Sequence, residues 1–247
     1  MPEPTQFADQ TPYDVRFEWG ERGLRALAGR VRAFVIVDVL SFSTCVALAC
    51  ARGATIFPYL WKDERVTAFA AGKRALVARA RRATGDGYSL SPASLARIPA
   101  GTRLVLPSPN GSSLSFGAAA SGPVWAGALR NASAVAARVQ SLGGPVAVIA
   151  AGERWPDESL RPAAEDLIGA GAIIARLPGS ASPEAALAAA AFERAAGDLP
   201  GTLAACASGR ELVEQGFGRD VELAAELDAS PVAAHLRDGA FERDDGG

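Results

Sequence analysis

Short apolar runs alternate with longer alanine-rich segments along the first 150 residues, and this alternation limits the possible folds most. Five runs have the length of a strand and are apolar on both faces: VRAFVIVDVL, ATIFPYL, RLVLPS, PVWAGAL and PVAVIAAG. Strands of this kind are typical of a parallel sheet that helices cover on both sides. A segment of helical character follows each run. The order therefore predicts an α/β fold, a three-layer α/β/α arrangement with a mostly parallel central sheet.

The remaining segments complete a single predicted domain that spans residues 1–247. YDVRFEW near the start reads as an additional edge strand, and one of the predicted helices spans about residues 63–82. Three helical segments follow Leu160: RPAAEDLIGAGAIIARL, PEAALAAAAFERAA, and ASGRELVEQGF onward. Residues 83–100, with Gly, Ser and Pro, predict a loop. The tail from about residue 240 is expected to be disordered.

The composition limits the partners and the compartment. The formal net charge is −2, so no broad basic surface and no nucleic-acid partner are expected. The alanine-rich runs are too short, and too often interrupted by charge, to span a membrane, so no membrane partner is expected. The three cysteines form no CxxC motif and the start MPEPTQFADQ shows no secretion signal, which predicts a cytoplasmic protein. No pattern fixes the oligomeric state, and a homodimer is left open.

Polar residues collect where the predicted strands end. In open α/β sheets, ligands bind beyond the carboxyl ends of the strands. The residues at four of these ends are Asp38, Ser41, Ser43 and Thr44; Ser108, Asn110, Gly111, Ser112 and Ser113; Arg130 and Asn131; and Gly152, Glu153 and Arg154. Carboxylates, hydroxyls, amides and arginines thus share one expected edge of the sheet, and the glycines allow a ligand to approach the backbone.

Most of these residues also have a purely structural interpretation. Ser41 or Thr44 can cap a helix, which stabilises it by about 1 kcal/mol. Asn110 and the glycine after it can form a turn, and Asn131 can be an N-cap. The neighbouring Glu-Arg pair after the fifth strand can be a solvated ion pair worth well under ~1 kcal/mol. Taken singly, the hydroxyls and amides are therefore more often structural than functional.

Two aspartates are harder to explain in structural terms. Asp38 interrupts a core strand, where a bare carboxylate costs several kcal/mol unless it is paired, metal-bound or neutralised. Asp166 shares its helical face with small and apolar residues three, four and seven positions on, so it is expected to point inward. Its neighbour Glu165 is expected to pair with Arg161, four residues earlier.

Several familiar chemistries lack their motifs. The chain has no GxxxxGK[ST] and no GxSxG, and GAGAI lacks the third glycine and the preceding strand of a dinucleotide fingerprint. His235 is the only histidine and has no evident partner, which argues against Ser-His triads, phosphohistidine chemistry and His-rich metal sites. Carboxylates suit Mg²⁺, and helix N-termini with Ser and Thr suit phosphate. These features indicate Mg²⁺-assisted handling of a phosphate ester.

Six short motifs along the chain resemble one known family. VIVDVLSFST, LVLPSPNGSS, ALRNASAVA, IAAGER, EDLIGAGAII and EQGFGRDV occur in the order that is typical of the 2-phosphosulfolactate phosphatases, the ComB-like family. The resemblance runs from about Phe34 to Val221. It implies an α/β/α fold and a Mg²⁺-dependent acid phosphatase that releases phosphate from 2-phospho-3-sulfolactate in coenzyme M biosynthesis.

The resemblance also implies site residues. The matching positions are Asp38, Asn110, Gly111, Ser112, Asn131, Ala132, Ala151, Gly152, Asp166, Gly216, Phe217 and Asp220. The family commonly has an arginine three residues after the strand-end aspartate, and that position is Ser41 here. Either Arg154 supplies the missing positive charge or the substrate is less anionic.

These observations predict roles for a small anionic phosphorylated substrate and Mg²⁺. The candidate catalytic residues are Asp38, Glu153 and Asp166. Asp38 and Asp166 would bind the metal, and Glu153 would be a metal ligand or general base. The candidate substrate-binding residues are Ser41, Thr44, Asn110, Gly111, Ser112, Asn131 and Arg154. Whether Asp38 attacks phosphorus or only binds metal is left open.

Two alternatives stand beside this prediction. One is a haloacid-dehalogenase-like phosphatase with Asp38 as nucleophile, but that class has a second aspartate two residues on, where this chain has Leu40. The other is a non-catalytic protein that binds or senses an anionic phosphorylated metabolite on the same fold. Metal-dependent turnover distinguishes an enzyme from the sensor.

Overall fold

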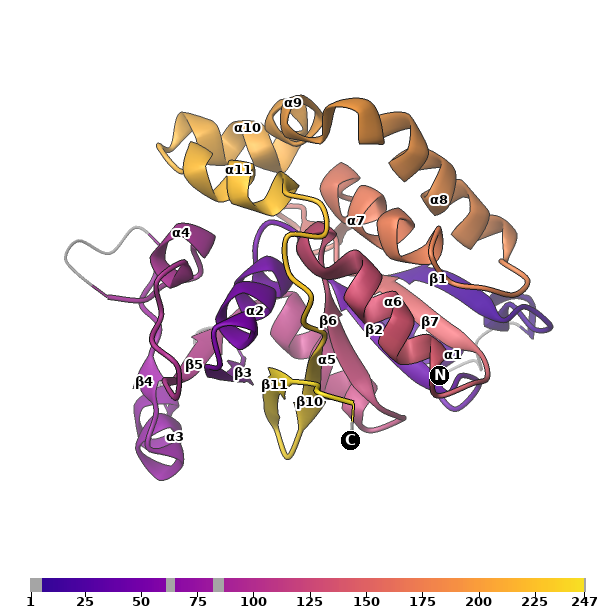
Figure 1. Cartoon of the computed structure of the whole chain (residues 1–247). Coiled ribbons are helices and arrows are strands. Elements are labelled where there is room, and N and C mark those ends of the chain that lie inside the picture. Colours follow the sequence, from indigo (N-terminus) through magenta and orange to yellow (C-terminus); the bar gives the residue numbers. More distant parts are fainter. Residues whose placement is uncertain (1–5, 61–64, 82–86, 247) are drawn as a thin grey trace.

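A nine-stranded sheet forms the centre of the protein (Figure 1). The computed structural model describes residues 6–60, 65–81 and 87–246. The strands of this sheet are β1 (Val15–Trp19), β2 (Ala33–Val37), β3 (Thr55–Tyr59), β4 (Leu76–Val77), β5 (Arg103–Pro107), β6 (Val124–Gly127), β7 (Val146–Ala150), β10 (Ala234–Arg237) and β11 (Ala240–Arg243). Their order is β1-β7-β2-β6-β10-β11-β3-β5-β4. A separate antiparallel pair consists of β8 (Glu153–Arg154) and β9 (Leu160–Arg161).

Most neighbouring strands of the large sheet run parallel. β7 pairs in parallel with β1 and β2, β2 with β6, and β5 with β3 and β4. The hairpin β10–β11 is the exception, because it pairs antiparallel to β6 on one side and to β3 on the other. The predicted α/β class with a mostly parallel central sheet is confirmed, and so is the position of β1 at the edge.

Helices cover both faces of this sheet. They are α1 (Gly20–Leu27), α2 (Phe42–Ala51), α3 (Val66–Lys73), α4 (Pro92–Leu95), α5 (Gly111–Ala119), α6 (Ala132–Gln140), α7 (Ala164–Ile174), α8 (Pro183–Ala195), α9 (Leu199–Ala205), α10 (Ala207–Glu214) and α11 (Gly218–Ala225). The described residues also form three short 3-10 helices, η1 (Gln6–Asp9), η2 (Leu129–Asn131) and η3 (Ala196–Asp198). Helices α8 to α11 lie together across the top of Figure 1. None of the helices within the described ranges is both long enough and apolar enough to cross a bilayer.

Strand β2 shows how the sequence builds the two-sided core. Val35 and Val37 pack into the cluster that also contains side chains of α6, α7 and α8. Phe34 and Ile36 pack into the opposite cluster, with side chains of α1, α2 and α5. The alternation follows from the two-residue period of a strand, so every side chain of β2 is buried on one face or the other.

The loop and tail regions differ from the sequence-based expectations. The helix predicted for about residues 63–82 is too long, because α3 ends at Lys73 and β4 occupies Leu76–Val77; residues 61–64 and 82–86 lie outside the described part. The predicted loop 83–100 contains α4. The expected disorder from about residue 240 is wrong, because β11 occupies Ala240–Arg243 and Asp244 accepts hydrogen bonds from the side chains of Trp125 and Arg138. Only residue 247 of the tail is outside the description.

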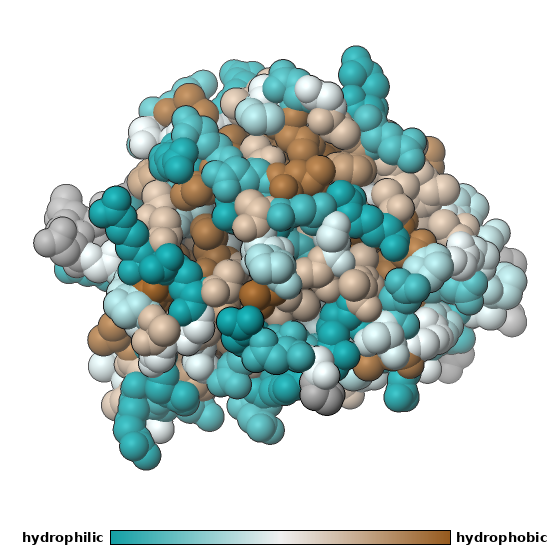
Figure 2. Space-filling model, in the orientation of Figure 1, coloured by the Kyte–Doolittle hydropathy of each residue, from teal (hydrophilic) through white to brown (hydrophobic). Residues whose placement is uncertain are grey.

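The surface on the side seen in Figure 1 is mixed in character. Hydrophobic residues are scattered there among hydrophilic ones and do not form one broad apolar area (Figure 2). The sheet edge that carries the polar strand ends is therefore the more informative region of the molecule.

Candidate active site

Asp38 is the carboxylate at the end of β2, and two helices begin at its oxygens. Oδ1 accepts a hydrogen bond from the backbone N–H of Phe42 at 3.2 Å, and Oδ2 accepts one from Gly111 at 2.9 Å. Phe42 is the first residue of α2 and Gly111 the first of α5. Unpaired N–H groups and the positive end of the dipole at each helix start stabilise an anion there. Gly111 allows this approach, because a Cβ at this position would lie 2.9 Å from Asp38 Oδ2.

Asp166 joins the ends of two neighbouring strands in the same way. It is the third residue of α7 and is 3 % exposed. Oδ1 accepts from the N–H of Val39 at 2.7 Å, and Oδ2 accepts from Gly152 at 2.8 Å. Val39 follows β2 and Gly152 follows β7, so this carboxylate fixes both loops. The prediction that Asp166 points inward is confirmed.

Glu153 stands at the start of the β8–β9 hairpin, next to Gly152. Its Oε2 accepts a hydrogen bond from Asn110 Nδ2 at 3.1 Å, so the predicted strand-end residues of β5 and β7 do meet. Burial, then the negative charges of Asp38 and Glu165, raise the pKa of Glu153 to about 7. The charge of Arg161 and the Asn110 hydrogen bond oppose this rise. Glu153 is therefore a carboxyl group that can hold a proton near neutral pH.

Four carboxyl groups influence one another at this place: Asp38, Glu153, Glu165 and Asp166. Burial raises the pKa of Asp38 to about 6; the N–H groups of Phe42 and Gly111 oppose the rise, and the Glu165 charge adds to it. Burial, then the charge of Asp38, raises the pKa of Asp166 well above its usual value. Mutual repulsion of this kind is characteristic of functional sites that bind a cation or hold a proton.

Glu165 is a member of this cluster that the sequence did not reveal. It was expected to pair with Arg161 on a helix surface, and this expectation is wrong. Arg161 lies in β9 and donates to Ser208 Oγ at 3.0 Å. Glu165 is 2 % exposed, and its Oε2 accepts from the Cys206 thiol at 3.3 Å. Its partner Cys206 is 41 residues further along the chain, so no local pattern could have indicated this burial.

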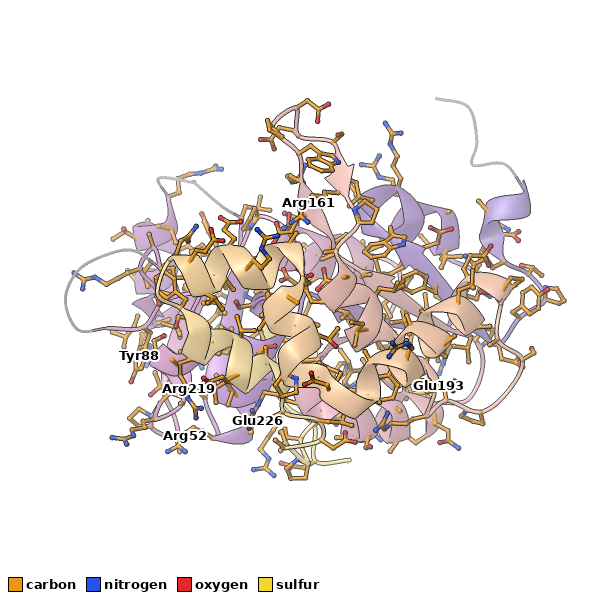
Figure 3. All side chains as sticks on the ribbon, turned by 90° about the horizontal axis from the view of Figure 1, so that it is seen from above. Arg52, Tyr88, Arg161, Glu193, Arg219 and Glu226 are labelled. Atoms are coloured by element: carbon orange, nitrogen blue, oxygen red, sulfur yellow. The ribbon has the colours of Figure 1, made fainter. Side chains whose placement is uncertain are left out.

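A cavity of about 390 Å³ lies beside the cluster, under helix α10. It is lined by Leu40, Arg81, Glu153, Arg154, Arg161, Ser208, Glu211, Leu212 and Gln215. Figure 3 shows Arg161 beside the yellow-orange helices of the C-terminal part. Asp38 is 7 % exposed and is not itself one of the lining residues. A second cavity of about 650 Å³, between α1, α5 and the hairpin, shares Asn110, Glu153 and Arg154 with this region.

Arg81 is the second functional candidate that the sequence did not reveal. Its Nη2 donates to Ser41 Oγ at 2.5 Å, and its charge lowers the pKa of Asp38. Arg154, one of the two explanations offered for the charge missing at Ser41, donates to the Glu158 carbonyl at 3.2 Å and lies 3.8 Å from the Glu158 carboxylate, and it also lines the cavity. Arg81 and Ser41 are 40 residues apart in the sequence, so only the tertiary fold brings them together.

The remaining predicted binding residues use their polar atoms on the protein itself. Thr44 Oγ1 donates to the Val39 carbonyl at 2.7 Å. Ser112 Oγ donates to the Leu106 carbonyl and accepts from the N–H of Tyr59. Asn131 accepts from the N–H of Ala128 and donates to two backbone carbonyls. None of the three lines the 390 Å³ cavity, and a direct contact of these side chains with substrate stays a prediction.

The donor set of the cluster suits Mg²⁺ in its chemistry. Every oxygen of Asp38 and Asp166 accepts one backbone N–H, which leaves each oxygen a further lone pair. Among the described residues, no three acidic, histidine or cysteine side chains are arranged as a ready metal cage. Mg²⁺ commonly keeps several waters and is held by one or two carboxylates together with substrate phosphate. The residues therefore fit a metal that binds together with its substrate.

The fold is of the α/β class, and its clustered carboxyl groups and arginines lie at the strand ends of the sheet, where proteins of this class bind ligands. Comparison with known proteins gives the family. Residues 25–239 match the model of the family described as 2-phosphosulpholactate phosphatase, and the chain belongs to that family. A protein named probable 2-phosphosulfolactate phosphatase, from Carboxydothermus hydrogenoformans, is 30% identical over 220 residues, which cover 84% of this chain and 88% of that protein. Family membership makes this chain a phosphoric monoester hydrolase and confirms the resemblance seen in its motifs.

Proposed function

We propose that this protein hydrolyses the phosphate ester of 2-phosphosulfolactate, or of a closely related phosphorylated hydroxy acid, in a Mg²⁺-dependent reaction. The observation that carries the proposal is the acidic cluster around Asp38 beside a cavity that three arginines line. The reaction would take place in the cytoplasm and, as the motifs imply, would serve coenzyme M biosynthesis.

The positive charges around the cavity match such a substrate. A phosphorylated hydroxy acid carries a phosphate and at least one further acid group, so it has several negative charges at neutral pH. Arg154 and Arg161 line the cavity from hairpin β8–β9, and Arg81 lines it from the segment after β4. Guanidinium groups bind carboxylate, sulfonate and phosphate oxygens through paired N–H donors, so each acid group can have its own arginine.

Asp38 would hold Mg²⁺, with Asp166 as the second candidate ligand. The metal, when bound, would neutralise negative charge on the phosphoryl oxygens. The two N–H donors on Asp38 keep its carboxylate in one place, since each comes from the rigid start of a helix. Asp166 fixes the loop that carries Glu153 relative to β2. The chain thus holds its two reactive carboxyl groups at fixed positions before substrate arrives.

Glu153 would give its proton to the leaving group. When the bond between phosphorus and the alcohol oxygen breaks, the electron pair stays on that oxygen, which then needs a proton. A carboxyl group with a pKa of about 7 holds a proton for a large part of the time at neutral pH. Asn110 orients the carboxyl group through its 3.1 Å hydrogen bond. This role as general acid replaces the general-base role expected from the sequence alone.

The pH dependence of the rate tests the role of Glu153. A general acid must be protonated, so kcat/KM should fall as pH rises through about 7, and Glu153→Gln should remove this limb and lower kcat by roughly 10²–10⁴-fold. A kcat/KM that instead rises through pH 7 and then levels off would show that Glu153 acts as a base.

Water would attack phosphorus directly in this proposal. Both oxygens of Asp38 already accept N–H groups, which makes this carboxylate a poorer nucleophile than a free one. The alternative is attack by Asp38 itself, which would form a phosphoryl-aspartate. Borohydride reduction of enzyme quenched during turnover would convert that species to homoserine at position 38. Peptide mass spectrometry that finds only aspartate there would support attack by water.

A substrate panel tests the proposed activity. Phosphate release should be measured from 2-phosphosulfolactate, phospholactate and phosphoglycolate by the purified full-length chain with Mg²⁺. We expect the most anionic ester to have the highest kcat/KM, because three arginines line the cavity. Stabilisation by these compounds without release from any of them would contradict the proposal and support a binding protein or sensor.

A further inference from the structure

Arg81 is held in place by four groups that come from three separate parts of the fold. Its Nη2 donates to Ser41 Oγ in the loop between β2 and α2. Its Nε donates to the carbonyl of Leu90 at 2.9 Å. From the C-terminal helices, the ring of Phe217 lies 5.4 Å from its guanidinium carbon, and Asp220 Oδ2 lies 3.9 Å from Nε. Such a set of contacts leaves the guanidinium little freedom of position.

The same guanidinium keeps donors unused. An arginine has five N–H donors in a planar fork. The hydrogen bonds of Arg81 to the described residues come from Nε and Nη2, and Nη1 makes none to them. Arg81 lines the 390 Å³ cavity, and its charge lowers the pKa of Asp38. A fixed cation with free donors beside the central carboxylate is a binding group for an anionic oxygen.

Asp220 supplies the fixed negative charge behind Arg81. It is 1 % exposed and is the third residue of α11. Its Oδ1 accepts from Ser91 Oγ at 2.6 Å and from the N–H of Ala93 at 2.9 Å. Its Oδ2 is buried and has no hydrogen-bond partner among the described residues. An unsatisfied buried carboxylate oxygen is costly, and the Arg81 cation, whose Nε lies 3.9 Å away, offsets part of this cost.

We propose that Arg81 binds a phosphoryl oxygen of the substrate and that Asp220 is the positioning residue that holds it there. This inference rests on the proposed phosphatase function and assigns the arginine on the Asp38 side of the cavity to the phosphate group. Arg154, which lies on the hairpin beside Glu158, is left for another acid group of the substrate. Ser41 and Phe217 keep the guanidinium plane in place.

Binding of inorganic phosphate to the full-length protein tests the assignment without any turnover. Isothermal titration should show that Arg81→Met weakens phosphate affinity at least 10-fold, while the control Arg194→Met, at an exposed arginine of α8 outside the cavity, changes it less than 2-fold. Arg81→Lys keeps the charge but not the fork, so its affinity should lie between the two. Unchanged affinity in Arg81→Met, or no phosphate binding by the wild-type protein, would overturn the proposal.

A pair of variants at the supporting carboxylate tests the positioning role. Asp220→Asn removes the charge next to Arg81 and should weaken phosphate affinity several-fold, with KM for substrate rising more than kcat falls. Ser91→Ala removes a hydrogen bond to the other oxygen of the same carboxylate but leaves its charge, so it should leave phosphate affinity unchanged. Equal losses in both variants would mean that Asp220 acts only through stability.

Two further measurements keep these outcomes separate. If Asp220→Asn does not fold, Arg81→Ala with added guanidinium ion gives the second test: the ion should restore phosphate affinity, and a failure to restore it would count against the assignment. Turnover of the wild-type protein is measured separately on phosphorylated hydroxy acids. Phosphate binding through Arg81 in a protein that hydrolyses none of them would refute the proposed function but not the binding site.

Discussion

At the scale of single residues, Asp38 has a structural role in the fold and is the central residue of the proposed active site. Its oxygens accept the first N–H groups of α2 and α5, so the carboxylate stabilises the starts of two helices. Burial nevertheless raises the pKa of Asp38 to about 6, and the negative charge of Glu165 adds to this rise. The two N–H groups and the charge of Arg81 oppose it. The sequence could predict that Asp38 is unusual, but it could not show that its oxygens accept the first N–H groups of two helices, because one of these helices starts 73 residues further along the chain.

Replacing Asp38 by Asn tests this double role. The variant has one acceptor oxygen for two N–H donors, so an amide NH₂ would face a backbone N–H. We expect the free energy of unfolding to fall by about 1–3 kcal/mol and phosphate release to fall by on the order of 10³-fold. Urea denaturation and steady-state kinetics measure the two effects. Asp157→Asn, at an exposed carboxylate that accepts from Ser159, is the control and should change neither. A wild-type rate in Asp38→Asn would contradict the assignment.

Glu153 makes the stability of the protein depend on pH. Its pKa is about 7 in the folded protein and near 4.5 in the unfolded chain. The folded state therefore binds more protons than the unfolded state between these values, and the free energy of unfolding falls as pH rises from about 4.5 to 7. Glu153→Gln removes this contribution. The free energy of unfolding of the variant minus that of wild type should be larger at pH 8 than at pH 4.5, by roughly 1–3 kcal/mol. Urea denaturation at the two pH values measures this change. A difference between variant and wild type that does not change with pH would show that folding does not raise the pKa of Glu153.

At the scale of elements, apolar strands were predictable and short polar hairpins were not. The runs around β2, β3, β5, β6 and β7 are five apolar stretches, and each became a strand. β8 and β9 have two residues each, and β10 reads AHLR, so none of them has a run or an alternation to detect. Hairpin β8–β9 nevertheless carries Glu153, Arg154 and Arg161 into the site. Arg81 and Glu165 were missed for the same reason, since only tertiary contacts bring them there.

The start of hairpin β8–β9 depends on Gly152. Its φ is +66°, and a Cβ there would lie 2.7 Å from Leu160 Cδ1 and 2.9 Å from the Arg161 carbonyl oxygen. Gly152→Ala should therefore displace the hairpin, lower the free energy of unfolding by roughly 1–3 kcal/mol and reduce kcat/KM, because Glu153 moves with it. Gly143→Ala is the matched control, since Gly143 also has a positive φ (+63°) but no atom within 4 Å of such a Cβ. Equal losses in stability and rate for the two variants would contradict this account.

At the scale of the whole molecule, the C-terminal hairpin holds the two parts of the sheet together. One part consists of β1, β7, β2 and β6, and the other of β3, β5 and β4. β10 pairs with β6 and β11 pairs with β3, so among the described residues this hairpin connects the two parts of the sheet. The ring of His235 stacks on Trp125 with centroids 4.2 Å apart, which gives the only histidine a structural place. The sequence does not predict that its last two strands lie in the middle of the sheet, because pairing between distant segments leaves no local pattern.

Truncation tests this role of the hairpin. A chain that ends at Pro231 lacks β10 and β11 and exposes unpaired edges on β6 and β3. We expect it to be unfolded or aggregated, as judged by circular dichroism and size-exclusion chromatography. A chain that lacks only residues 246 and 247 should behave as the full-length protein does. A folded, monodisperse product that ends at Pro231 would show that the hairpin is dispensable.

The proposed function is the Mg²⁺-dependent hydrolysis of a small, highly anionic phosphate ester. The most direct measurement is phosphate release from 2-phosphosulfolactate by the purified full-length protein, with excess Mg²⁺ and after chelation of metal by EDTA. We expect EDTA to abolish turnover and added Mg²⁺ to restore it. We expect no turnover by Asp38→Asn. Equal release with and without metal, or no release from the folded protein with Mg²⁺ present, would contradict it.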